Sequence, residues 1–489
     1  MSATLTAPSE HFLSAPCLLR RKTTTLTNDV YYPVVSLVVG AVLVQTAKLF
    51  RPGEFIVPED AVASITLDFS RLVLGIQLFI AGIQLPRQYL KTEWKSLALL
   101  LGPGMIGMWA CSSAVIWLLV PNLPFLHALA IAACVTPTDP VLSSSIVKGK
   151  LADEKVPKEL QQLIVAESGA NDGLGYPFLF VALYLIKYAP QEGGTQTAMK
   201  LFFGRTCVYV VVMSVLYGGA VGWLSQKLLR WAQKRKYVDQ ESFVTFPVGI
   251  AIFILGTCGM VGSDDVLACF VAGNVFTWND WFRLETVEDS MQPAVDMMLN
   301  LAAFMWLGAV CPWESFWQSE VVTLGRLFAI GALVLLLRRL PILVALHQYI
   351  WQIKGYGQAM FVGYFGPIGV SAIFYLYIGL EFLETVTVGT EGETHQREDA
   401  TRLGDTMMTV IWFLIISSVV SLDCPSSTKV CLNADWEFGV GCSRIEHPPE
   451  QIGATCLEET HSSSSSTACL DTTASVRNTI QVMKFSVNS

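Results

Sequence analysis

The sequence has little charge, and this scarcity narrows the class of protein. Only 15% of the 489 residues are Asp, Glu, Lys or Arg, whereas 52% are hydrophobic; soluble domains usually carry about 25% charged residues. No polar block large enough for a soluble domain separates the long apolar runs before residue 422. Several runs reach the ~20 residues that a helix needs to cross a hydrocarbon core of ~30 Å. The composition therefore predicts an all-α membrane protein.

Motifs that would indicate a metalloprotein or an ATP-hydrolysing protein are also missing. The 12 cysteines stand singly, and no two of them form a Cys-x-x-Cys pair, so neither a structural zinc site nor a disulfide framework is indicated. There is no Gly-x-x-x-x-Gly-Lys-Ser/Thr loop, the phosphate-binding loop of many ATPases. Residues 1–30 are polar, and the first apolar run lacks a small-residue cleavage site. We expect no enzymatic activity, no cofactor, no nucleic-acid partner and no cleaved signal peptide.

About twelve membrane helices are predicted from the apolar runs. Lys and Arg concentrate, about twofold, in the connectors that follow even-numbered segments, so the positive-inside rule places these connectors and both termini in the cytoplasm. We expect a cytoplasmic segment 1–31, a transmembrane domain 32–422 and a disordered cytoplasmic tail 423–489, which contains a serine run and no helical periodicity. The approximate bounds of the segments are 32–50, 67–86, 97–120, 126–145, 160–186, 206–229, 243–261, 265–278, 295–311, 321–337, 359–380 and 406–422.

The fourth segment contains a sequence that favours a break in the helix. Thr136-Pro137-Thr138-Asp139-Pro140 lies inside the apolar run. Each of the two prolines lacks an amide hydrogen and disfavours helix in the residue before it. We therefore expect the helix to open around Thr138 and Asp139, exposing backbone carbonyls and helix ends within the membrane. Broken helices of this kind form ion and substrate sites in secondary transporters.

The fifth segment is predicted to be one helix that carries Glu167-Ser168-Gly169-Ala170-Asn171-Asp172-Gly173. Ser168 and Asp172 are four residues apart and share a face, as Glu167 and Asn171 do. Hydroxyl, amide and carboxylate oxygens suit Na⁺, by extension of the ligand preference of other hard cations. A lone Ser or Asn more often only bonds to a neighbouring helix. An ionisable group in a membrane segment, however, is a functional-site candidate by default, which favours Asp139 and Asp172 as cation ligands.

A second interruption occurs far along the chain. The sequence from Phe365 to Val370 places Gly366, Pro367 and Gly369 inside the apolar run 359–380. Paired interruptions in the two halves of a transporter indicate an inverted repeat around one site, although no sequence repeat is evident here. The alternative is a tolerated membrane proline between two packing glycines.

Two further polar pairs have an open interpretation. Asp264 and Asp265 are adjacent, so they point to different helix faces; they either cap the following helix at its positive end or act in transport. Asp296 and Asn300 share a helix face. They either line a polar cavity or pack against another helix.

These residues together resemble the fungal plasma-membrane Na⁺(K⁺)/H⁺ antiporters, a branch of the monovalent cation:proton antiporter superfamily. The resemblance runs in order and at similar spacing from about residue 65 to residue 420. The matching blocks are 75–79, 85–89, 136–141, 166–173, 177–180, 241–243, 264–267, 272–273, 278–282, 338–341 and 361–369.

The resemblance implies an antiporter fold with inverted repeats and two crossing, unwound helices, in a homodimer embedded in membrane lipid. It implies a cation and proton site at Asp172, surrounded by Thr138, Asp139, Ser168 and Asn171. Supporting roles follow from the matching positions: Asp264 and Asp265 match a pair that is important for transport in the family. Arg338 and Arg339 match a basic pair that could neutralise buried carboxylates, and Glu167 is a further supporting residue.

The function that follows is exchange of Na⁺, or of K⁺ or Li⁺, for H⁺ across the plasma membrane. A passive cation channel is the main alternative. Only one weak apolar segment precedes Ile65, and the tail after Val420 departs from the family pattern, so a truncated, non-transporting relative is a second alternative. An intramembrane aspartyl protease using Asp139 and Asp172 is disfavoured, because neither residue lies in a Tyr-Asp or Gly-x-Gly-Asp motif.

Overall fold

Each of the twelve predicted membrane segments coincides with helix in a computed structural model, which describes residues 33–46, 59–140, 142–143, 156–286, 291–318, 321–388 and 395–422. The described residues all lie in one unit, Met1–Gly439. Seven helices are long and apolar enough to cross a membrane, and three shorter apolar helices accompany them in this part of the chain. The predicted terminal segments 1–31 and 423–489 lie outside the described residues.

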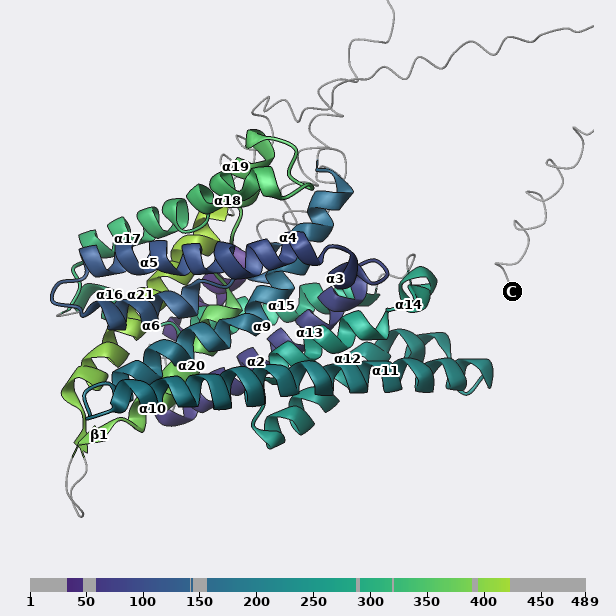
Figure 1. Cartoon of the computed structure of the whole chain (residues 1–489), viewed down its shortest axis with the longest axis horizontal. Helices are drawn as coiled ribbons and strands as arrows, with labels where there is room; N and C mark the ends of the chain where they lie inside the picture. Colours follow the sequence, from purple (N-terminus) through teal and green to yellow (C-terminus); the bar gives the residue numbers. More distant parts are fainter. Residues whose placement is uncertain are drawn as a thin grey trace, which may run out of the picture. The chain divides into compact units, whose positions relative to one another are not determined.

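The helices follow one another in a bundle (Figure 1). Only one short antiparallel hairpin, β1 (Thr387–Val388) with β2 (His395–Gln396), is found among the described residues. A first helix covers Pro33–Thr46. The remaining helices are α2 (Glu59–Gln84), α3 (Tyr89–Thr92), α4 (Trp94–Leu99), η2 (Leu100–Gly104), α5 (Met105–Leu119), α6 (Phe125–Val135), α9 (Lys158–Tyr188), α10 (Gly194–Leu201), η3 (Phe202–Val212), α11 (Met213–Lys234), α12 (Gln240–Val261), α13 (Asp265–Phe276), α14 (Trp281–Glu285), α15 (Met291–Val310), α16 (Ser315–Gln318), α17 (Leu324–Leu337), α18 (Leu340–Leu346), η4 (His347–Tyr349), α19 (Tyr356–Tyr364), α20 (Val370–Glu384) and α21 (Glu398–Leu422).

Several helices extend beyond the predicted apolar runs. α2 already begins at Glu59, and the sixth segment, predicted over 206–229, lies in a helical stretch from Gly194 to Lys234. Hydropathy marks only the stretch that is apolar enough for lipid, whereas the backbone hydrogen bonds of a helix continue into more polar sequence. The bounds, not the existence, of these segments were therefore misjudged.

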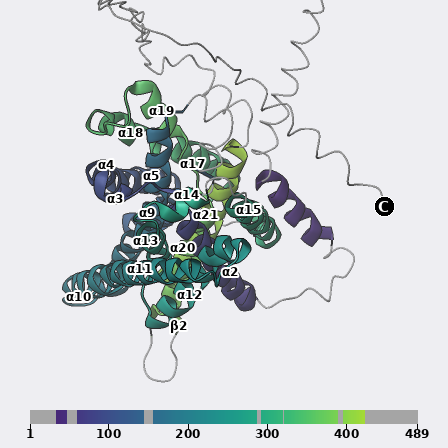
Figure 2. The same ribbon diagram turned by 90° about the vertical axis from the view of Figure 1, so that its right-hand side faces the viewer.

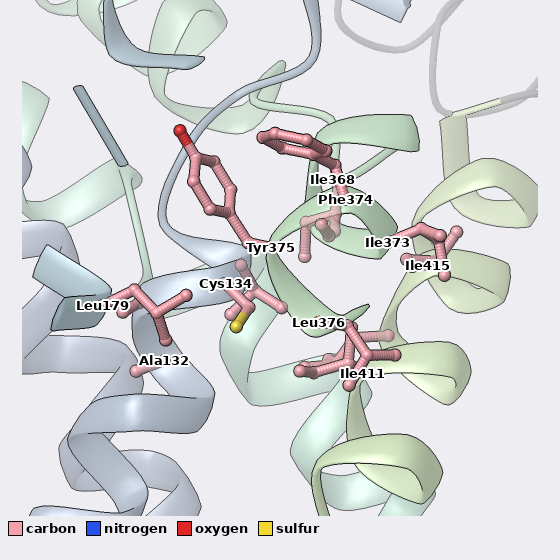
Figure 3. Close-up of a cluster of buried hydrophobic side chains, with 14 of the residues drawn as sticks. Ala132, Cys134, Leu179, Ile368, Ile373, Phe374, Tyr375, Leu376, Ile411 and Ile415 are labelled. Atoms are coloured by element: carbon pink, nitrogen blue, oxygen red, sulfur yellow. The ribbon is translucent and has the colours of Figure 1, made fainter. Parts of the chain in front are cut away.

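Two apolar clusters divide the bundle. The larger one joins α6, α9, α20 and α21, and Figure 3 shows its centre, where Ile373 and Leu376 of α20 face Ile411 and Ile415 of α21. The smaller one joins α2, α11, α12 and α13 around Phe79, Phe276 and Phe282. The two sets of helices, which we call the two bodies, meet along α2, α9 and α13, and both α2 and α13 contribute side chains to the two clusters.

Glycines bring the two bodies into close contact. A Cβ added at Gly169 of α9 would lie 2.4 Å from the ring of Phe270 in α13, and one added at Gly173 would lie 2.9 Å from the Cα of Leu267. Glycine thus allows α9, which carries the predicted site residues, to lie directly on α13. Figure 2 views the same bundle from the side.

Both predicted helix breaks are confirmed. α6 ends at Val135, the residues Thr136–Asp139 are not helical, and helix resumes at Pro140. α19 ends at Tyr364, and α20 begins at Val370 after five non-helical residues. The breaks touch, since the Asp139 amide donates a hydrogen bond to the Pro367 carbonyl over 3.1 Å. Two interrupted helices therefore cross at the position where the polar motifs meet.

Candidate functional site

The Asp139 carboxylate lies between the two helix starts at the crossing. Its Oδ1 accepts a hydrogen bond from the Leu142 amide over 3.1 Å, in the half-helix that follows Asp139. Its Oδ2 accepts one from the Val370 amide over 2.8 Å, at the first residue of α20. One carboxylate thus caps two helix N-termini, whose unpaired amides and partial positive charge favour an anion. Gly369 permits this approach, because a Cβ there would lie 2.0 Å from Oδ2.

Arg338 lies at the C-terminal ends of the two half-helices that precede the breaks, α6 and α19. Its guanidinium donates hydrogen bonds to the Val135 carbonyl, where α6 ends, and to the Gly366 carbonyl, beyond the end of α19. A further bond of 3.4 Å reaches the Pro137 carbonyl. A cation at helix C-termini satisfies carbonyls that have no partner within the helix. Arg338 therefore takes up carbonyls that the break was expected to leave open to a cation, and its hydrogen bonds go to carbonyls, not to carboxylates.

Arg339 contacts a carboxylate, as the resemblance implied for this basic pair. Its guanidinium donates to Glu167 Oε1 over 2.9 Å and also to Oε2, and each of the two side chains is only 2% exposed. The Arg339 guanidinium also donates to the Thr138 hydroxyl over 3.3 Å and to the Val362 carbonyl over 3.0 Å. This ion pair ties α9 to both broken helices.

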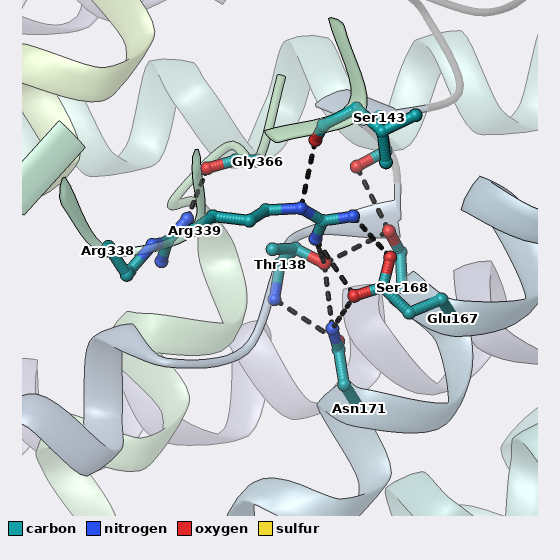
Figure 4. A network of polar contacts seen from close by, with 9 residues as sticks. Thr138, Ser143, Glu167, Ser168, Asn171, Arg338, Arg339 and Gly366 are labelled. Carbon is teal, nitrogen blue, oxygen red and sulfur yellow. Dashed lines mark hydrogen bonds and ion pairs between the residues drawn. The ribbon is translucent and has the colours of Figure 1, made fainter. Parts of the chain in front are cut away.

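Thr138, Ser168 and Asn171 form one hydrogen-bonded network (Figure 4). Asn171 donates to the Thr138 hydroxyl over 2.8 Å and accepts from the Thr138 amide over 3.2 Å. It also donates to Glu167 over 3.3 Å, which confirms the shared face expected for these two residues. The Ser168 hydroxyl lies 3.1 Å from the Thr138 hydroxyl and 3.2 Å from that of Ser143. The network fixes the unwound backbone at Thr138 against α9.

Asp172 is the exception among these polar residues. Its side chain is fully buried, and neither carboxylate oxygen has a hydrogen-bond partner of normal geometry among the described residues, although the Ser371 side chain lies beside it. The Tyr375 hydroxyl donates to the backbone carbonyl of Asp172, not to its carboxylate. A buried carboxylate without a partner is costly when charged, so it requires either a proton or a bound cation. The structure thus supplies a vacant acceptor beside a network whose other members are paired.

Asp264 and Asp265 serve two different partners. Asp264 is the N-cap of α13, where its Oδ1 accepts from the Leu267 amide over 2.9 Å, so the predicted capping role is confirmed. The Asp265 carboxylate lies 3.0 Å from the Arg71 guanidinium of α2. The two side chains therefore point in different directions, as adjacency predicted, and Asp265 links α13 to α2.

Asn300 packs against another helix. Its side-chain oxygen accepts from the Gln77 amide group of α2 over 3.0 Å. This contact favours the packing alternative for the polar face of α15, whereas the predicted polar cavity has no support from it.

Some residues of the site carried no signal in the sequence. Ser143 lies in a run of serines, Tyr375 in an apolar helix, and Arg71 in the middle of α2. Their partners are at least 25 residues away, so no local pattern identifies them. Among the described residues there is no group of three or more His, Cys, Asp or Glu side chains that could hold a metal ion.

A helical membrane bundle in which two broken helices cross beside a buried carboxylate has the architecture of a secondary transporter. Comparison with known proteins agrees, since the transmembrane domain of sodium/hydrogen exchangers matches residues 12–422. The chain belongs to this sodium/hydrogen exchanger family.

Fungal antiporters are among the relatives. The Na(+)/H(+) antiporter 2 of Zygosaccharomyces rouxii is 37% identical over 371 residues, which cover 73% of this chain and 44% of that protein. The Na(+)/H(+) antiporter of Saccharomyces cerevisiae is 39% identical over 312 residues, or 64% and 31% of the two chains. That of Schizosaccharomyces pombe is 32% identical over 362 residues, or 73% and 75%. The chain spans less than half the length of the first two.

A solved structure shows the same fold. The sodium proton antiporter MjNhaP1 from Methanocaldococcus jannaschii, at pH 8, superimposes with a TM-score of 0.58 at 17% identity. The match covers 83% of this chain and 98% of that one. At this identity the likeness concerns the fold.

Proposed function

We propose that this protein exchanges Na⁺ for H⁺ across a membrane, with Asp172 as the residue that binds either ion. One observation carries the proposal: the Asp172 carboxylate is fully buried and both its oxygens lack a hydrogen-bond partner of normal geometry among the described residues. Burial disfavours the charged carboxylate, whereas a nearby cation favours it. A proton and Na⁺ would therefore exclude each other at this position.

The surrounding residues would hold the site in shape. The Asp139 carboxylate stabilises the helix N-termini at the crossing, and the Arg338 guanidinium stabilises the helix C-termini. The unwound segments therefore stay unwound, and both charged groups have partners. Because Asn171 and Thr138 already bond to each other, we assign them first to positioning. Ser168 and Thr138 retain hydroxyl lone pairs that are suited to a hard cation.

Transport of Na⁺ and H⁺ is coupled if the site can move from one side of the membrane to the other only when Asp172 holds one of the two ions. The body that contains α9, α20 and α21 would shift against the body of α2, α11, α12 and α13, with Asp172 near the surface between them. A proton gradient would then drive Na⁺ in the opposite direction. This makes the protein a transporter and not an enzyme.

Four finer assignments belong to the same proposal. By the positive-inside argument, both termini lie in the cytoplasm. The names of the fungal relatives, all Na(+)/H(+) antiporters, support Na⁺ as the cation, with K⁺ or Li⁺ as further substrates. The plasma membrane as location and a homodimer as assembly rest on the family resemblance.

The test is proton movement in vesicles that contain the purified protein and a pH-sensitive dye. An acid interior is established, and Na⁺, K⁺ or Li⁺ is then added outside. An exchanger removes protons in response to the cation even when the membrane potential is clamped. A passive cation channel, the runner-up, moves cations without obligatory proton counterflow, and a non-transporting relative gives the signal of empty vesicles. Either of the last two results would reject the proposal.

A further inference from the structure

A stripe of alternating aromatic and basic side chains follows one face of α11. Trp223, Lys227, Trp231 and Arg235 are each four residues apart, so they share a helix face. All four are exposed, with the two tryptophans 56% and 51% accessible. The Lys227 ammonium lies 5.8 Å from the Trp223 ring centre, and the Arg235 guanidinium lies 5.6 Å from that of Trp231. We call these four residues the α11 stripe.

The stripe lies in a region of unbalanced positive charge. Arg230, Lys234 and Lys236 add to it, so five basic residues occur between positions 227 and 236. None of the five forms an ion pair with a carboxylate in the described ranges, where the ion pairs found involve other basic residues.

Three acidic residues around the stripe make other contacts. Glu285 accepts hydrogen bonds from Gln233 and Trp281, over 2.5 and 2.7 Å. Asp280 pairs with Arg283 over 2.6 Å. Asp239 caps α12, and the hydrogen bonds from the Ser242 side chain and from the Ser242 amide lower the pKa of its carboxyl group. The positive charge of the stripe is therefore available to an external anion.

The preference for cations at a helix C-terminus does not explain all the basic residues of the stripe. Lys234 and Arg235 lie at the C-terminus of α11, where cations are favoured, but Lys227 lies almost two turns earlier. Leu224 and Leu228, exposed beside it, continue an apolar surface toward the membrane. Tryptophan, exposed leucine and basic groups in this order are typical of the boundary between hydrocarbon and headgroups.

We propose that the α11 stripe binds the headgroups of anionic phospholipids in the cytoplasmic leaflet. The tryptophan rings would lie at headgroup depth, and the exposed basic residues Lys227, Lys234, Arg235 and Lys236 would contact phosphate and carboxylate groups. Arg230 is half-buried, with its guanidinium 4.7 Å from the Trp281 ring centre, and adds only its charge. The predicted orientation places the connector after α11 in the cytoplasm, the side on which anionic lipids collect. α11 lies at the edge of the bundle in both views, where lipid can reach it (Figure 1 and Figure 2). This inference does not depend on the proposed exchange activity.

The experiment compares two lipids on the purified, full-length protein in detergent. Phosphatidylserine or phosphatidylcholine with identical acyl chains is titrated in, and the melting temperature is read from the protein that remains soluble after heating. We expect phosphatidylserine to raise the melting temperature at lower concentration. Each basic residue near an anionic surface changes binding by roughly fivefold. The variant Lys227→Gln/Lys234→Gln/Lys236→Gln should therefore need on the order of 10- to 100-fold more phosphatidylserine, with an unchanged response to phosphatidylcholine.

A matched control removes the same charge elsewhere. Arg87→Gln/Lys91→Gln/Lys95→Gln neutralises three exposed basic residues of another predicted cytoplasmic connector, and it should retain the response to phosphatidylserine. Trp231→Leu keeps an apolar side chain but loses the ring under Arg235, and should weaken the response about as much as one charge does.

Three results would overturn the proposal. In the first, the control variant loses the response to phosphatidylserine as strongly as the stripe variant does, which would indicate a general surface-charge effect. Inorganic phosphate can compete with the lipid at millimolar concentration, which would indicate a site for a soluble anion. Finally, the stripe variant can dissociate a dimer while its lipid response is unchanged, which would show that a second copy of the chain covers this face.

Discussion

The Arg339 guanidinium and the Glu167 carboxylate form an ion pair inside the bundle, with each side chain 2% exposed. The pair connects the start of α18 to the middle of α9, and through Thr138 it reaches the first broken helix. A buried ion pair gains little over an apolar pair of the same shape, but removing one partner leaves an uncompensated charge. Its main effect at this crossing is to fix which side chains face one another.

Replacing Glu167 by Gln should lower the stability of the protein strongly. The uncharged amide leaves the Arg339 guanidinium buried and unpaired, which costs about 3–5 kcal/mol. Loss of folded protein on heating, followed by size-exclusion chromatography, measures the change. Glu159→Gln is the matched control, because Glu159 pairs with Lys354 at 3.4 Å with both side chains about half exposed; such pairs contribute about 0–1 kcal/mol. Equal melting temperatures for the two variants would contradict the expectation.

Asp172→Asn should abolish cation-coupled proton movement while the protein still folds. The Asp172 carboxylate makes no hydrogen bond of normal geometry that the amide would lose, and the amide carries no charge that a proton or Na⁺ could neutralise. Dye-reported exchange in vesicles at matched protein content measures the effect. Asp405→Asn, at an exposed position of α21, should exchange normally. Normal exchange by Asp172→Asn would remove this residue from the mechanism.

Asp139 should act through structure, and Asp172 through titration. In Asp139→Asn one of the two capped amides, that of Leu142 or that of Val370, loses its acceptor, at a cost of about 1 kcal/mol. We expect weaker apparent cation affinity with the pH midpoint of residual exchange near its original value. Asp172→Glu should move that midpoint, because it changes the titrating group itself. A midpoint that follows Asp139 and ignores Asp172 would reverse the two roles.

Gly173→Ala should slow exchange and destabilise the bundle. The added methyl group would lie 2.9 Å from the Leu267 Cα, so α9 must move away from α13 at the contact between the two bodies; overpacking of this kind costs about 1–3 kcal/mol. Gly219→Ala is the control, since a Cβ there meets nothing within 4 Å. The control should be neutral or slightly stabilising, by up to about 1 kcal/mol of helix propensity. Melting temperatures and exchange rates of both variants test this.

Deleting residues 423–489 should leave membrane insertion and folding unchanged. The described bundle ends with α21 at Leu422, and the sequence beyond it has no apolar run long enough to span a membrane. Membrane extraction and size-exclusion profiles of the shortened and full-length chains provide the comparison. Aggregation of the shortened chain would show that the tail is part of the folded protein.

The sequence by itself determined the features that depend on local chemistry. Apolar runs long enough for the bilayer established the membrane class and twelve helical segments, because hydropathy acts residue by residue. Pro137 and Pro140 predicted the first break, and Gly366 with Pro367 the second, because a missing amide hydrogen is a property of the residue itself. The four-residue spacing of Glu167 and Asn171 placed both on one face of α9.

Only the tertiary structure decided which polar groups meet. Glu167 pairs with Arg339, 172 positions along the chain. Arg338, from the same basic pair, instead donates hydrogen bonds to the carbonyls of Val135 and Gly366. Whether Asp139 would be a ligand or a cap could not be read locally either, since one of its two amide partners belongs to Val370. These contacts depend on how the two broken helices cross. The crossing in turn is set by the packing of the whole bundle, which depends on residues from many segments and cannot be read from one of them.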